Sequence, residues 1–183
     1  MTEGFFSTEA GGYASIAKQF LEGALVLSEA QRDRGKILFR PTLALAGQGL
    51  EVLLKACMSL NREAPKTKGR DGHDIVGMWN LDVCEPVRGH VLANAVRVAA
   101  ESRQDVGYLV VPAEDEVLPL IQEYVRTLGE LHGGGGFPLR YPSAAHTQAP
   151  RTPFLVQALW TTADDFVKRP GDFELKRFRG QTT

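Results

Sequence analysis

Apolar residues recur every three or four positions along several long stretches of this 183-residue chain, the period of one face of an α-helix. The first stretch covers residues 7–33 and predicts a helix that stops at Gly35. A second predicted helix has Pro41 in its first turn and runs to about Asn61. A short third helix is predicted from Asp74, and three longer helices follow it. These last three are predicted at residues 85–102, 112–132 and 153–168.

Two short stretches allow strand structure. Tyr108–Val111 is apolar, and it fits either a strand or the approach to the next helix. Residues 137–141 are expected to be extended, because prolines restrict the residues before them. Helical stretches dominate, so the sequence predicts an all-α fold, an up-and-down helical bundle of about five to six helices with at most a minor short β element. The length suits one domain over residues 1–183, with residues 170–183 as a basic, loosely attached tail.

Composition and charge narrow the class of protein. Hydrophobic residues make up 43% of the chain and charged residues 23%, which is ordinary for a globular protein. The net charge of −1 excludes a positive field over the whole protein that would attract nucleic acid. A local basic patch remains compatible with this charge. The first residues lack the basic start and apolar run of a signal peptide, and no stretch was expected to approach a membrane span. We therefore expect a cytoplasmic protein without membrane association.

The cysteines and histidines give no metal motif. Cys57 and Cys84 stand outside any Cys-x-x-Cys pair, and no histidine spacing completes a zinc site. Cys57 lies on an apolar helical face and is predicted to be a buried free thiol. His90 and His132 are isolated in the sequence and receive no role. The sequence therefore predicts no metal and no cofactor.

One helix and the segment after it carry the candidate chemistry. Glu51 and Lys55 stand at i, i+4 within an apolar helix, and His73 and Asp74 follow a polar loop. Glu51 and Lys55 fit either a groove for a phosphate or nucleotide or a simple ion pair. His73 and Asp74 fit either a proton-transfer couple, or an Asp74 that caps the third helix while His73 packs beside it. Lys55 is also placed to reach Asp74 across the bundle.

These residues carry a family resemblance. The segment Leu50–Ala56 resembles the Glu-Leu-x-Leu-Lys-Ala helix of HEPN-like domains, a prokaryotic family. Gly72–Ile75 is similar to the Gly-His-Asp-Leu that commonly follows that helix. The resemblance implies an up-and-down helical bundle that is often a homodimer. Many members are RNases of toxin–antitoxin, CRISPR or phage-defence systems, and others bind nucleotides without catalysis.

The resemblance implies three functions for this chain. The first is a nucleotide- or nucleic-acid-binding module of a prokaryotic defence or toxin–antitoxin system without strong catalysis. The second is a metal-independent RNase, because catalytic members carry an Arg and a His separated by four to six residues, as Arg140 and His146 are here. Pro142 lies between them, and Tyr141 stands where the family usually has a polar residue. The third is a dimeric protein-interaction module.

Two charged segments complete the candidates. Lys66, Lys68 and Arg70 form a basic loop that either contacts phosphates or is only solvated. Glu114–Glu116 is an acidic run, which fits acid–base or metal chemistry. The same run stands at the start of a predicted helix, where negative charge is stabilising for structural reasons alone.

Overall fold

The computed structural model describes residues 2–66, 69–102, 113–133, 138–139, 150 and 152–175. Regular structure in these ranges is entirely helical, which confirms the all-α prediction. Five of the α-helices are long and two, α1 and α4, have five residues each. The α-helices are α1 Thr2–Phe6, α2 Glu9–Arg34, α3 Phe39–Leu60, α4 Ile75–Trp79, α5 Glu85–Ser102, α6 Glu114–Gly133 and α7 Thr152–Lys168. Four 3₁₀ turns join or extend them, namely η1 Gly35–Leu38, η2 Arg70–His73, η3 Asp82–Cys84 and η4 Pro170–Phe173.

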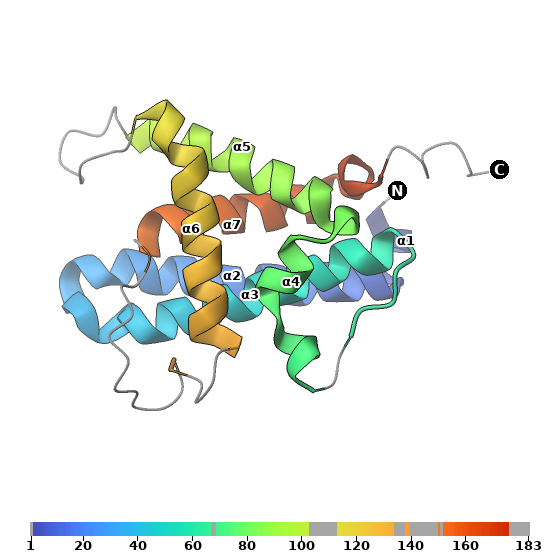
Figure 1. Cartoon of the computed structure of the whole chain (residues 1–183), viewed down its shortest axis with the longest axis horizontal. Coiled ribbons are helices and arrows are strands. Elements are labelled where there is room, and N and C mark those ends of the chain that lie inside the picture. The colour runs from blue at the N-terminus through green and yellow to red at the C-terminus, as the bar shows by residue number, and fades with distance from the viewer. Residues whose placement is uncertain are drawn as a thin grey trace.

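The long helices form two packed pairs with a crossing helix (Figure 1). Helices α2 and α3 are joined by η1 and lie side by side, and α2 also packs against α7. Helices α5 and α7 form the second pair. Helix α6 runs across both pairs and brings its C-terminal end against α4 and η2. This crossing brings the end of α6 to the segment that precedes α4.

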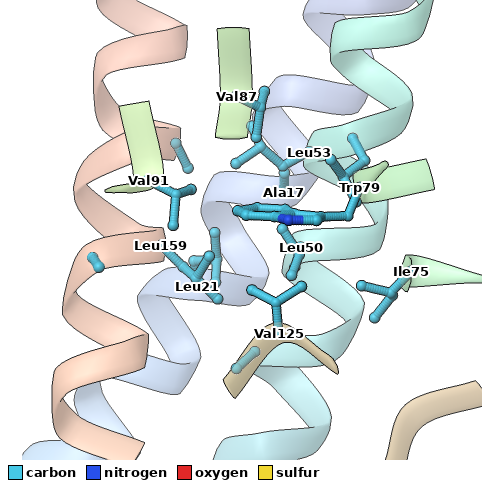
Figure 2. Packing of buried hydrophobic residues seen from close by; sticks show 14 of the residues in the cluster. Ala17, Leu21, Leu50, Leu53, Ile75, Trp79, Val87, Val91, Val125 and Leu159 are labelled. Carbon is cyan, nitrogen blue, oxygen red and sulfur yellow. The ribbon is translucent and has the colours of Figure 1, made fainter. Parts of the chain in front are cut away.

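One hydrophobic core joins all the long helices. The Trp79 indole of α4 lies among side chains of α2 and α3 and is 5% exposed (Figure 2). Leu50 and Leu53 of α3 are completely buried beside it. Burial of an aliphatic or aromatic side chain of this size contributes about 1.5–3 kcal/mol. Other members shown in Figure 2 include Ala17, Leu21, Val87, Val91, Val125 and Leu159.

The beginning of the chain differs from the prediction. Helix α2 begins at Glu9, because the Thr8 hydroxyl accepts a hydrogen bond from the Gly11 amide at 3.0 Å and caps the helix. The short helix α1 precedes it and was not predicted. Gly11 is needed for this turn, since a Cβ at this position would lie 2.0 Å from the Phe5 carbonyl oxygen. Helix α2 ends at Arg34, and Gly35, the predicted stop, caps it with a φ of 66° that favours glycine.

The remaining helix boundaries agree with the predictions to within about two residues. The Ala113 amide donates to Glu116 Oε2 at 2.9 Å, so α6 begins at Glu114 rather than Pro112. Residues 108–111, which fit either a strand or the approach to the next helix, lie outside the described residues. Of residues 137–141, the structure describes Pro138 and Leu139, which form a turn.

The C-terminal segment begins with packed rather than loose structure. Phe173 is completely buried, and its ring stacks on His90 at a centroid distance of 4.1 Å. The Asn61 side chain donates to the Phe173 carbonyl at 3.0 Å and accepts from the Leu175 amide at 2.8 Å. Residues 170–175 are therefore anchored by an aromatic side chain that the prediction of a loose tail overlooked. Residues 176–183 lie outside the described part of the chain.

The run Gly35–Leu60 is long and apolar enough to cross a membrane by length and composition, because a window of 18 residues within it has a mean hydropathy of 1.4. The expectation that no stretch approaches a span is wrong on these two criteria, because η1 continues directly into α3. In the structure 72% of this window is buried inside the protein. The apolar residues of α3 are thus used in contacts with the surrounding helices. Both cysteines are buried free thiols, as predicted for Cys57.

Candidate functional site

A single buried carboxylate joins three separate elements of the fold. Glu51 of α3 is 2% exposed. Its Oε1 accepts a hydrogen bond from Lys55 Nζ at 2.6 Å, one turn further along α3. Its Oε2 lies 2.8 Å from His132 Nε2 at the end of α6 and 3.1 Å from His73 Nδ1 in η2. We call these four residues the Glu51 cluster.

The partners of Glu51 determine its charge. Burial opposes ionisation, but the hydrogen bonds from His132, Lys55 and His73 and the charge of Lys55 outweigh it and lower the pKa of Glu51 to about 2. The carboxylate is therefore ionised at neutral pH and can only accept hydrogen bonds. It follows that His132 carries a proton on Nε2 and His73 carries one on Nδ1.

The four residues differ in their access to solvent. The side chains of Lys55 and His132 are 6% and 5% exposed, whereas that of His73 is 44% exposed. The Lys55 ammonium group is therefore a buried counter-ion of Glu51. His73 is the member through which the cluster meets solvent. Its Nδ1 is bonded to Glu51, and within the described residues its Nε2 has no hydrogen-bond partner, so Nε2 is available to a ligand.

The structure decides between the two interpretations of the His73–Asp74 pair. Asp74 is exposed, and its carboxylate accepts from the Gly77 amide at 2.8 Å, which caps α4. The capping interpretation is confirmed, and the carboxylate that His73 contacts belongs to Glu51 instead. Lys55 likewise pairs with Glu51 rather than with Asp74. Asp74 supports the site indirectly, because it fixes the start of the helix that follows His73.

His132 is the residue that sequence reasoning missed. It lies 81 positions from Glu51, so no local spacing connects the two. The available signal is Gly47, which stands one turn before Glu51 on α3. A Cβ at Gly47 would lie 2.8 Å from His132 Nδ1, so the glycine makes room for the ring. Gly49, on the same helix, makes room for α2 instead, since a Cβ there would lie 2.5 Å from Leu21 Cγ.

The other candidate residues are not members of the Glu51 cluster, and several of them lie outside the described residues. Arg140 and His146, the residues of the RNase hypothesis, lie outside the described residues. In the basic loop, Lys66 is exposed, Lys68 is not described, and Arg70 is described by its backbone alone. In the acidic run, Glu116 caps the start of α6.

Comparison of the chain with protein-family models, with curated proteins and with solved structures finds no match. The site must therefore be interpreted from its own chemistry. An imidazole held by a buried carboxylate and open to solvent is suited to donating a hydrogen bond to an anion or to exchanging a proton with one.

Proposed function

We propose that this chain is a binding module for the phosphate of a nucleotide or nucleic acid, with His73 as the contact residue. The observation that carries the proposal is the hydrogen bond between Glu51 Oε2 and His73 Nδ1, at 3.1 Å. It brings the two segments that resemble HEPN-like domains together at one point. This hydrogen bond also fixes the orientation of the half-exposed His73 imidazole.

The chemistry of phosphate binding follows from this orientation. When His73 is protonated, its Nε2–H can donate a charge-assisted hydrogen bond to a phosphate oxygen, and the Glu51 carboxylate balances the imidazolium charge. Such bonds contribute about 1.5–3 kcal/mol. Lys55 has no part in direct contact, because its ammonium group is buried and bonded to Glu51. This differs from the sequence-based expectation that Glu51 and Lys55 line the groove.

Binding rather than strong catalysis is proposed because three members of the Glu51 cluster are committed to one another. Lys55, His132 and Glu51 are each at least nine-tenths buried, which leaves only His73 to meet a ligand. A role in a prokaryotic defence or toxin–antitoxin system, in the cytoplasm and as a homodimer, belongs to the same proposal and rests on the resemblance. The RNase and interaction-module hypotheses stay predictions.

Calorimetric titration with ATP, inorganic phosphate and a short single-stranded RNA tests the proposal. We expect one of these ligands to bind wild type and His73→Ala to bind it about tenfold more weakly, which corresponds to 1.4 kcal/mol. His90→Gln is the matched control, since His90 packs on Phe173 instead. Absence of binding to all three ligands, or equal binding by wild type and His73→Ala, would contradict the proposal. A stable dimer without ligand binding would favour the interaction module.

A further inference from the structure

We propose that Glu51, His73 and His132 form a binding site for a divalent transition-metal ion, with Zn²⁺ as the favoured occupant. Each of the three side chains offers one ligand atom, and these atoms all lie within 4.8 Å of one another. Two imidazole nitrogens and one carboxylate oxygen suit zinc and similar ions. This inference goes beyond the proposed function and does not depend on it.

The spacing of the donor atoms is close to that of a zinc site. Zinc binds imidazole nitrogen and carboxylate oxygen at about 2.0–2.2 Å, so that neighbouring donors of a tetrahedral site lie roughly 3.3 Å apart. Glu51 Oε2 lies 2.8 Å from His132 Nε2 and 3.1 Å from His73 Nδ1. Both nitrogens already face the same oxygen. An ion can therefore take the place of the two hydrogen-bonded protons if each nitrogen moves away from Oε2 by about half an ångström or less. The two nitrogens, which lie within 4.8 Å of each other, must also adjust to the tetrahedral spacing.

Lys55 holds the carboxylate in the orientation that such a site needs. It bonds to Oε1, which leaves Oε2 for the two histidines. Carboxylates that bind metals are commonly oriented in this way by a hydrogen bond to their other oxygen. The positive charge of Lys55 also opposes a bound cation, so we expect weaker binding than at a zinc site with an unpaired carboxylate.

The burial pattern leaves a position for a fourth ligand. Glu51 and His132 are buried and fixed on α3 and α6, whereas His73 is 44% exposed on the 3₁₀ turn η2. An ion can thus enter past His73. Zinc sites with three protein ligands and one open side generally hold water or a substrate there. The same position would meet an anion that approaches His73.

Zinc titration of the full chain after removal of metal with a chelator tests the proposal. Isothermal titration calorimetry without nucleotide should give one zinc ion per chain for wild type. His73→Ala, which alters a half-exposed residue and should leave the fold intact, is expected to weaken binding at least about tenfold. His90→Gln, which removes a histidine outside the cluster, should keep the wild-type affinity.

A spectroscopic measurement distinguishes this site from zinc bound elsewhere. In the metal-free protein the His73 proton lies on Nδ1, and zinc coordination by Nδ1 moves it to Nε2, which ¹⁵N-detected NMR of the imidazole reports. Failure of wild type to take up zinc would overturn the proposal and leave a hydrogen-bonded cluster only. Zinc uptake that His73→Ala leaves unchanged, or a His73 proton that stays on Nδ1, would also overturn it. Since no nucleotide is present, these outcomes leave the proposed function to its own test.

Discussion

Replacing the Glu51 carboxylate by an amide should destabilise the whole protein. In Glu51→Gln the side chain keeps its shape, but its single acceptor oxygen cannot serve Lys55, His73 and His132 together. The amide NH₂ would face at least one other donor, and the Lys55 ammonium would remain buried without its counter-ion. Removing one partner of a buried ion pair costs about 3–5 kcal/mol.

For a chain of this length, each kcal/mol corresponds to about 2–4 °C in Tm, so the expected decrease is about 6–20 °C. Far-UV circular dichroism measures Tm during thermal unfolding and the free energy of unfolding during urea unfolding. Glu101→Gln is the matched control, because Glu101 pairs with Arg97 at the surface and is 53% exposed. This control should lose less than about 1 kcal/mol. If Glu51→Gln unfolds within 1 kcal/mol of wild type, the reasoning about the buried carboxylate is refuted.

Three further predictions follow from the same contacts. The pKa of Glu51 is about 2 in the folded protein against 4.5 in the unfolded chain, so the ionised carboxylate stabilises the fold fully above about pH 4.5 and this stabilisation is lost as the pH falls toward 2. Urea unfolding of wild type should show the free energy of unfolding decrease by roughly 3 kcal/mol over that pH range. Glu51→Gln should lack this part of the pH dependence. Gly47→Ala should lower Tm despite the better helix propensity of alanine, because its Cβ would displace His132. The control Gly12→Ala has nothing within 4 Å of the new Cβ and should raise stability by up to about 1 kcal/mol. Equal effects of the two substitutions would be evidence against the contact between Gly47 and His132. Phe173→Ala should cost about 3–5 kcal/mol and expose the C-terminal segment to proteolysis, and a wild-type Tm would show that this segment is not anchored.

Local pattern predicted the helices well, because each long helix contributes one apolar face to a common core. The 3.6-residue period placed α5 at its observed bounds, and Asp74 was recognisable as a cap from its position before an apolar run. Boundaries were less predictable where tertiary contacts decide them. Helix α1 and the packing of Phe173 depend on contacts with distant helices that no local pattern contains.

The candidate site was half predictable. Glu51, Lys55 and His73 were identified from local motifs. The sequence paired His73 with Asp74, however, whereas the structure pairs it with Glu51. The i, i+4 spacing predicted the Glu51–Lys55 pair but not its burial, which arises because α6 crosses over α3. His132 could not be placed, because its approach to Glu51 depends on that crossing and on the space at Gly47.

In the Glu51 cluster, one ionised carboxylate holds two histidines through opposite ring nitrogens. Long-range ¹H–¹⁵N NMR of the imidazoles in the metal-free protein, at a pH where both rings are neutral, tests this most directly. We predict a proton on Nδ1 of His73 and on Nε2 of His132, with the His73 preference lost in Glu51→Gln. A neutral His73 protonated on Nε2 in the wild-type protein would contradict the account.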